Sequence, residues 1–168
     1  LLDEENIEFC QRILADYGDK IVLPVDFAVT YEFTNDEEYR VRDAKELATD
    51  EMGLDIGPET LKLYEDIVDD AAIVIWNGPL GVYEFEKYKK HTNELLEHIV
   101  ENNVKAILGG GDIVAAATTA GYKDKVYHAS TGGGATLEYL EGKVLPGLEA
   151  IEQVKESDGK IVYTKSLW

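Results

Sequence analysis

The chain has 168 residues and carries 16 Lys and Arg against 34 Asp and Glu, a formal charge of −18. This length and a composition of 45% hydrophobic and 10% aromatic residues are typical of one folded globular domain, which argues against intrinsic disorder. An acidic chain repels nucleic-acid phosphates and anionic bilayers, so we expect no nucleic-acid and no membrane partner. The single cysteine, Cys10, excludes an intramolecular disulfide. We expect Cys10 to be buried on a helix and the protein to be cytoplasmic.

The first half of the chain combines helical and extended patterns. Apolar residues at helical spacing predict a first helix near residues 3–16. A β-branched run predicts a short strand at 21–25, and further short strands are expected at 28–33 and 39–41. Pro58 indicates the start of a second helix, because proline is favoured at the first helical position.

The second half, from residue 71 onward, repeats one pattern three times: an apolar run, a glycine-rich turn and a helix. The apolar runs lie at 72–76, 104–108 and 126–129. The turns are NGPLG at 77–81, GGGD at 109–112 and STGGG at 130–134, and the helices are expected at about 85–99, from 112 to about 120, and at 135–141. Unbroken apolar runs separated by helices are typical of parallel strands buried on both faces. We therefore predict an α/β fold, a three-layer Rossmann-like parallel sheet with helices on both faces.

The three glycine-rich turns are expected to lie at the same edge of that sheet. Right-handed crossovers bring the carboxyl ends of parallel strands together, and open α/β sheets bind ligands in the crevice beyond those ends. Glycine permits close approach of the backbone, and the first N–H groups of each following helix attract anions. The pattern predicts a phosphorylated ligand, most simply a nucleotide. Neither a P-loop motif nor the complete G-x-G-x-x-G dinucleotide motif is present.

The turns contain no Lys or Arg, although phosphoryl transfer requires positive charge at the site. A complete active site would take that charge from a metal, from another part of the molecule, or from both. Asp112 has two compatible interpretations, an N-cap of the following helix or a carboxylate that holds Mg²⁺ on a nucleotide. Glu84 is either a ribose ligand or a first-turn acid of a helix.

The three histidines form no recognisable catalytic or metal-binding constellation with other residues. His91 and His98 are expected to flank the packed face of one helix, and His128 is expected to be structural. No Ser-His-Asp, Cys-His or zinc-type Cys/His pattern is visible in the sequence.

Several motifs, in the same order along the chain, closely resemble those of phosphoglycerate kinases. They are LPVD at 23–26, MGLDIGP at 52–58, WNGPLGVYE at 76–84, GGGD at 109–112, STGGGA at 130–135 and LEGKVLPG at 140–147. The resemblance covers about residues 1–150 and implies most of the C-terminal, nucleotide-binding half of a two-domain glycolytic kinase. Such an enzyme exchanges a phosphoryl group between 1,3-bisphosphoglycerate and ADP. We expect 1–150 to be a partial nucleotide-binding domain and 151–168 a C-terminal tail of unknown role, with a possible strand at 159–163.

The resemblance also implies roles for individual residues. Gly53, Leu54, Pro79 and Val82 would line the adenine side of the nucleotide, and Asn77 and Glu84 would face the ribose. Asp112 would engage the Mg²⁺ of ATP or ADP, with Gly110, Gly111 and Ile113 in the same nucleotide-binding set. The amides of Gly132, Gly133 and Gly134 would meet the transferring phosphoryl group, which would be attacked directly by oxygen without a covalent enzyme intermediate.

The chain departs from the family pattern in two ways. The N-terminal domain with its basic phosphoglycerate patch has no counterpart, and neither does the segment that supplies phosphate-binding lysines. In addition, Ile113 stands where the family usually has Ser or Thr, so one phosphate contact is lost. The portion alone is expected to be inactive, and the edge left by the missing half is expected to promote self-association. Two alternatives are a non-catalytic nucleotide-binding or regulatory module of the same fold and an unrelated flavodoxin-like binder.

Overall fold

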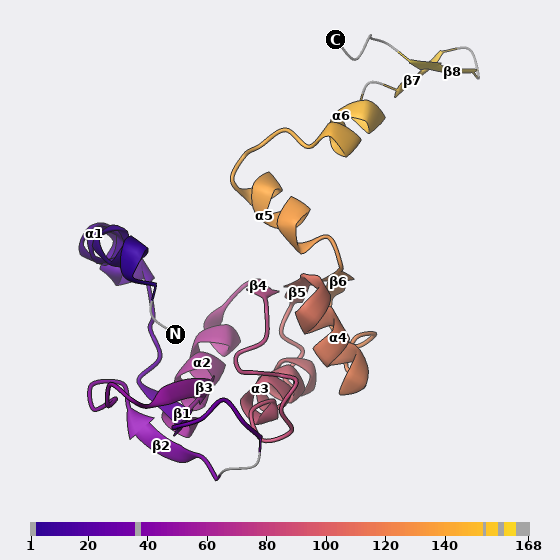
Figure 1. The fold of residues 1–168 in the computed structure, drawn as a ribbon. Coiled ribbons are helices and arrows are strands. Elements are labelled where there is room, and N and C mark those ends of the chain that lie inside the picture. The colour runs from indigo at the N-terminus through magenta and orange to yellow at the C-terminus, as the bar shows by residue number, and fades with distance from the viewer. Residues whose placement is uncertain (1–2, 36–37, 153, 158–159, 164–168) are drawn as a thin grey trace.

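The computed structural model describes residues 3–35, 38–152, 154–157 and 160–163, and side chains up to residue 150. Figure 1 shows two small sheets with helices beside them, and a C-terminal segment that leads away from them. The helices are η1 (Glu4–Asn6), α1 (Ile7–Tyr17), η2 (Gly18–Lys20), α2 (Pro58–Asp70), α3 (Lys90–Glu101), α4 (Gly111–Thr119), α5 (Gly133–Leu140) and α6 (Pro146–Glu152). The strands are β1 (Asp26–Thr30), β2 (Arg40–Asp43), β3 (Met52–Ile56), β4 (Val74–Asn77), β5 (Ala106–Gly109), β6 (His128–Ser130), β7 (Val154–Ser157) and β8 (Lys160–Tyr163).

The three repeats of the second half form a parallel sheet in the order β4-β5-β6. Trp76 pairs with Leu108, and Leu108 with Ala129, so the apolar runs lie side by side. Trp76 and Leu108 face a core that also takes in side chains from α2, α3 and α4. The predicted α/β class with a parallel sheet is confirmed. The face of β4 that carries Ile75 is more open than predicted, because this side chain is 44% exposed among the described residues.

The first half forms an antiparallel sheet in the order β2-β1-β3, which the sequence indicated only in part. β1 and β2 correspond to the strands expected at 28–33 and 39–41, with shifted ends. The strand expected at 21–25 is wrong: this run is not a strand, and Val22, Leu23 and Val25 are exposed. Pro24 lacks the N–H that a strand ladder needs, and no described strand pairs with this run, although Ala44 N–H donates to Val25 O at 2.8 Å.

Helix α1 lies close to the predicted boundaries, but its packing differs from the prediction. No residue of α1 is buried in the described chain, and Cys10 is exposed, so the expectation of a buried cysteine is wrong. Figure 1 shows α1 standing apart from both sheets. Its apolar residues Ile7, Leu14 and Tyr17 are exposed because no described element covers them.

The helix expected from about residue 85 begins later, at Lys90. Residues 82–89 instead form successive turns, in which Val82 N–H donates to Leu54 O at 2.8 Å and Phe85 N–H donates to Val82 O at 3.0 Å. Tyr88 is fully buried in a second cluster with Ala28 and Leu54, so contacts with the antiparallel sheet override the helical pattern. Glu84 is therefore not a first-turn acid of a helix.

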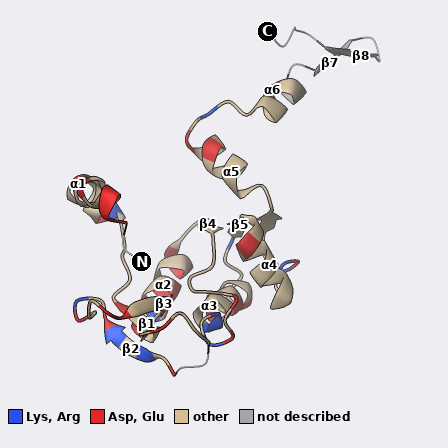
Figure 2. Cartoon of the chain, viewed as in Figure 1, with Lys and Arg blue, Asp and Glu red and all other residues tan. Residues whose placement is uncertain are grey.

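The C-terminal elements α5, α6 and the β7–β8 hairpin extend beyond the parallel sheet (Figure 1). Residues 160–163 of the expected strand form β8, whereas Gly159 lies outside the described residues. Charge is spread over most elements, with basic positions on β2 and acidic positions on α1 and α2 (Figure 2). Within the described part of the chain, no helix is both long and apolar enough to cross a membrane.

Candidate functional site

The glycine-rich turns meet at the carboxyl ends of the parallel strands, as predicted. Gly110 N–H, at the end of β5, donates to the carbonyl oxygen of Ser130 at the end of β6, at 2.9 Å. A Cβ atom on Gly110 would lie 2.9 Å from Asn77 Oδ1, at the end of β4. A Cβ atom on Gly133 would lie 2.6 Å from Gly110 Cα, a contact that side-chain carbon atoms do not make. Glycine at 110 and 133 therefore allows the three turns to pack directly against one another.

Gly110 is the N-cap residue of α4, with φ +117° and ψ 149°, a conformation open to glycine and not to other residues. No side chain caps this helix. Asp112 is the second residue of α4, so its interpretation as the N-cap is wrong. Its side chain is exposed, and among the described residues it has no hydrogen-bond or ion-pair partner. The carboxylate is thus available to a ligand at the helix N-terminus.

Helix α5 also begins after a glycine N-cap, in the third glycine-rich turn. Gly132 is its N-cap residue, and Gly132 N–H donates to Ser130 Oγ at 3.2 Å. The Thr136 hydroxyl donates back to Gly132 O at 3.0 Å, which secures the turn. Gly133 is buried, whereas Gly132 and Gly134 are exposed. The first N–H groups of a helix have no acceptor within the helix, so the starts of α4 and α5 are both suited to anions.

The loop at residues 78–84 connects this edge to the antiparallel sheet. Leu80 N–H donates to Thr92 Oγ1 at 3.0 Å, and Val82 N–H donates to Leu54 O at 2.8 Å. Tyr83 donates its hydroxyl to Asn93 Oδ1 at 3.0 Å or Ala116 O at 3.2 Å. Burial raises the pKa of Tyr83, so the hydroxyl stays protonated and keeps its donor role. The loop is therefore held by α3, α4 and β3.

One pocket beside this loop brings together three of the predicted adenine-lining residues. It has a volume of about 290 Å³ and is lined by Pro24, Phe27, Gly53, Leu54, Asp55, Ile56, Leu80, Gly81 and Val82. Gly53, Leu54 and Val82 thus share one largely apolar pocket, whereas Pro79 does not line it. A Cβ atom on Gly53 would lie 3.3 Å from Phe27 Cδ1, so a larger residue at position 53 would press against the Phe27 ring, which also lines this pocket.

A second pocket, of about 190 Å³, brings Glu84 and Asp112 together with Pro79, Tyr83 and Ala115. Two carboxylates from different segments thus line one hollow beside the start of α4. Mg²⁺ is commonly bound by one or two carboxylates together with substrate phosphates. The described residues contain no group of three or more His, Cys, Asp or Glu that could hold a metal by themselves. The donor set fits a cation that arrives with a nucleotide.

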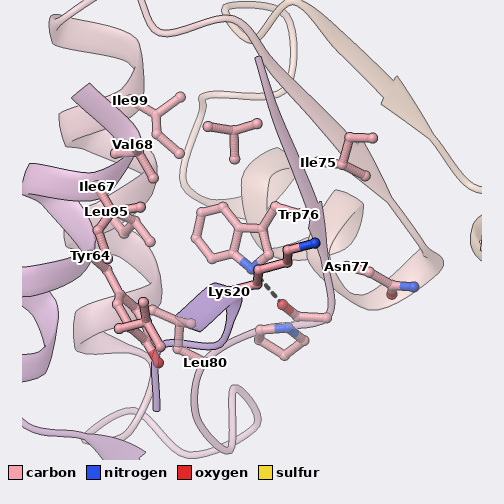
Figure 3. A pocket seen from close by; sticks show the side chains of 14 residues that line it. Lys20, Tyr64, Ile67, Val68, Ile75, Trp76, Asn77, Leu80, Leu95 and Ile99 are labelled. Carbon is pink, nitrogen blue, oxygen red and sulfur yellow. Dashed lines mark hydrogen bonds between the residues drawn. The ribbon is translucent and has the colours of Figure 1, made fainter. Parts of the chain in front are cut away.

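A third pocket, of about 490 Å³, lies beside β4 and is mainly apolar. Figure 3 shows Trp76 within it, with Tyr64 and Leu80 on one side and Ile75 and Asn77 on the other. Trp76 Nε1–H donates to Gly78 O at 2.7 Å and so fixes the start of the loop.

Lys20 also lines the third pocket, together with Asn77, and sequence reasoning missed this cation. It lies far upstream of the glycine-rich turns, and the only local signal was its place before the apolar run at 21–25.

Ile113 occupies a different environment from the other predicted nucleotide-binding residues. Its side chain is fully buried in the core of the parallel sheet, next to exposed Asp112. Only the backbone of Ile113 can face a ligand at the start of α4. Gly111 is exposed, and a Cβ atom there would meet no neighbour within 4 Å.

Comparison with known proteins places this arrangement in a family. The family model described as phosphoglycerate kinase matches residues 1–143. The chain is 47% identical over 152 residues to the phosphoglycerate kinases of Staphylococcus aureus strains JH9 and Newman, which covers 90% of this chain and 38% of each relative.

Solved structures agree with this match. Phosphoglycerate kinase from Coxiella burnetii superposes with a TM-score of 0.80 at 33% identity, covering 88% of this chain and 39% of that one. The enzyme from Pyrococcus horikoshii OT3 gives a TM-score of 0.76 at 32% identity, covering 88% and 36%. This chain spans about two fifths of the length of the relatives it matches, and it belongs to the phosphoglycerate kinase family.

Proposed function

We propose that this chain is the nucleotide-binding portion of a cytoplasmic phosphoglycerate kinase, a glycolytic phosphotransferase with a carboxyl group as acceptor. The reaction moves a phosphoryl group between 1,3-bisphosphoglycerate and ADP, and in reverse between ATP and 3-phosphoglycerate. The observation that carries the proposal is the meeting of three glycine-rich turns at one sheet edge, beside a pocket lined by Gly53, Leu54 and Val82. Phosphoglycerate itself would bind through a basic N-terminal domain outside residues 1–150.

In this proposal the nucleoside base enters the pocket formed by Gly53, Leu54 and Val82, and Asn77 and Glu84 face the ribose. The phosphates extend towards the N-termini of α4 and α5, where unpartnered N–H groups favour negative charge. The amides of 132–134 stabilise the transferring phosphoryl group. An ADP oxygen forms a bond to phosphorus as the bond to the carboxylate oxygen of the bisphosphoglycerate breaks, and 3-phosphoglycerate leaves.

Asp112 would hold the Mg²⁺ that accompanies the nucleotide, with Glu84 lining the same pocket. The bound cation supplies positive charge to the phosphate oxygens. The chain's own contribution is to orient the nucleotide through backbone amides and to fix Asp112 on the first turn of α4. Because the three turns contain no Lys or Arg, we expect this portion alone to bind nucleotide but to turn over negligibly.

Isothermal titration calorimetry with ADP, with and without Mg²⁺, tests the assignment. Asp112→Asn is expected to weaken binding of Mg-ADP about tenfold, the effect of losing one charge-assisted contact, and to leave metal-free ADP binding nearly unchanged. Asp124→Asn is the matched control, since it removes the same charge at an exposed position outside the three pockets. Equal Mg-ADP affinities for Asp112→Asn and the parent chain would remove Asp112 from the site.

A second candidate function is a non-catalytic nucleotide-binding or regulatory module of the same fold. The observation that favours it is the lack of Lys and Arg in the three glycine-rich turns, which leaves the transferring phosphoryl group without a cation from these turns. Measuring the intact mass of the protein purified from its source separates the two candidates. A polypeptide of the relatives' length with kinase activity supports the enzyme, whereas a mass near 18.7 kDa with nucleotide binding and no activity supports the module.

A further inference from the structure

Asp55 and His91 form a buried pair beneath the loop at residues 78–84. His91 Nδ1 lies 2.9 Å from Asp55 Oδ2, and the two side chains are 2% and 1% exposed. The same carboxylate accepts the backbone N–H of His91 at 3.3 Å and that of Ile56 at 2.9 Å. Asp55 belongs to β3 and His91 to α3, so the pair joins the antiparallel sheet to a helix of the parallel-sheet layer.

The loop packs directly on this pair. A Cβ atom on Gly81 would lie 2.6 Å from Asp55 Cγ and Oδ1, and 2.3 Å from the carbonyl oxygen of Tyr88. The absence of a side chain at Gly81 lets the loop backbone rest on the carboxylate. Displacing that carboxylate would therefore displace the backbone of Gly81.

The residues next in sequence to the pair hold the loop on both sides of Gly81. Thr92, which follows His91, accepts the N–H of Leu80 at 3.0 Å. Leu54, which precedes Asp55, accepts the N–H of Val82 at 2.8 Å. The pair thus sits between the two hydrogen bonds that position residues 80–82.

A buried pair of titratable groups is a costly way to join two elements, because apolar side chains of similar volume often stabilise a fold as well or better. What the pair adds is a defined geometry, since each hydrogen bond has a required distance and direction. The other carboxylate near the ring, Glu94 of the same helix, is 4.0 Å from His91 Nε2 and 39% exposed. Asp55 is therefore the partner that sets the orientation of His91.

We propose that Asp55 and His91 are positioning residues that fix 80–82 as one wall of the pocket for the nucleoside base. This rests on the proposed nucleotide-binding function. Leu80, Gly81 and Val82 line that pocket together with Gly53, Leu54 and Asp55, so a shift of the loop changes the space available to a planar base. Neither Asp55 nor His91 has to touch the phosphates for this role.

Tryptophan fluorescence and ADP titration together test the proposal on the full 168-residue chain. Trp168→Phe leaves Trp76 as the single tryptophan, and Trp76 reports on the loop because its Nε1–H donates to Gly78 O. In that background, His91→Leu removes the ring hydrogen bond, and His91→Asn returns an N–H donor near the position of Nδ1. His98→Leu is the control, because His98 lies on the same helix but pairs with Asp69 at 2.8 Å, away from the loop.

We expect His91→Leu to shift the Trp76 emission in the absence of ligand and to raise the ADP dissociation constant about tenfold, because residues 80–82 are no longer held in the binding geometry before ADP arrives. His91→Asn should restore the emission of the parent and bring the dissociation constant to within about twofold of the parent value, and His98→Leu should change neither.

If His91→Leu does not fold, Asp55→Asn in the same background replaces it: one carboxylate oxygen becomes an NH2 donor, so the side chain cannot accept all three N–H groups, and the Trp76 emission should shift. Because Asp55 also lines the pocket, the emission and not the ADP affinity is the deciding measurement for this variant.

Unchanged Trp76 emission and ADP affinity in His91→Leu would overturn the proposal. An equal loss of ADP affinity in His91→Asn and His91→Leu would also overturn it. Failure of the parent chain to bind ADP would count against the proposed function. In that case the Trp76 emission of the ligand-free variants still decides whether Asp55 and His91 position the loop.

Discussion

Adjacent residues at the start of α4 have opposite environments. Asp112 is exposed beside a pocket with Glu84, whereas Ile113 is fully buried in the core. A helix turns about 100° per residue, so neighbours in sequence point in different directions. The apolar residue that seemed to remove a ligand contact therefore has a packing role in this chain.

Truncation of Ile113 tests that role. Ile113→Ala is expected to lower the free energy of unfolding by about 2–5 kcal/mol, because it leaves a cavity in a close-packed core. Urea unfolding measures the change, and Thr119→Ala, an exposed position on the same helix, should change stability by less than about 0.5 kcal/mol. Lost ADP affinity with unchanged stability would instead make Ile113 a ligand contact.

At the scale of elements, the connection between β2 and β3, which lie on opposite sides of β1, is stabilised by a carboxylate with little exposed surface. The side chain of Glu51 is 1% exposed, and its carboxylate accepts Ala48 N–H at 3.1 Å and Arg42 Nε–H at 2.9 Å. The hydrogen bond from Ala48, and then the Arg42 guanidinium, lower the pKa of Glu51. A lowered pKa means that the folded state favours the charged form, so this stability is present above the ordinary pKa and is lost as the pH falls through the lowered one.

Glu51→Gln should therefore be less stable than the parent chain near neutral pH, and the difference should shrink towards acid. Urea unfolding from about pH 7 to about pH 3 measures it. Glu46→Gln, an exposed acid in the same connection, should show little difference at any pH. If the difference in the free energy of unfolding between Glu51→Gln and the parent grew as the pH fell, the stabilising role of the charged Glu51 would be contradicted.

The conformation of the loop at 78–84 and of the turns that follow it depends on contacts with other segments of the chain. The sequence of this segment suggested a turn followed by a helix from about residue 85, yet residues 82–89 form turns that pack Tyr88 against the antiparallel sheet. The hydrogen bonds from Leu80 to Thr92 and from Val82 to Leu54 join segments far apart in the sequence. The spacing of apolar residues within one segment cannot predict which distant residues accept these hydrogen bonds.

At the scale of the whole molecule, the described chain leaves apolar surface open beside β4. Within the described residues β4 pairs only with β5, and Ile73 and Ile75 are 49% and 44% exposed. An unpaired strand edge with apolar neighbours is a template for association with another chain. The length that this chain lacks relative to its relatives is consistent with such open surfaces.

We expect the 168-residue chain to self-associate through this edge. Sedimentation velocity should show an average mass that rises with protein concentration. Ile75→Lys places a charge at the strand edge and should lower the average mass at each concentration. Leu47→Lys is the matched control, because Leu47 is exposed but lies outside every described strand. A single monomeric species for the parent chain over a wide concentration range would refute the prediction.

The sequence by itself determined the repeated strand, glycine-rich turn and helix of the second half, because hydrophobic runs and glycines act locally. It also placed the three turns at one edge, since parallel strands with right-handed crossovers leave no other arrangement. Tertiary structure decided which glycine is indispensable: Gly110 has φ +117°, while Gly111 next to it has open space.

Tertiary structure also decided the strand β3, the late start of α3 and the exposure of Cys10. Above all, it joined Asp55 to His91 beneath the candidate nucleotide pocket. These features depend on contacts between segments distant in the chain, or on the lack of a covering element, and neither leaves a periodic signal in the sequence.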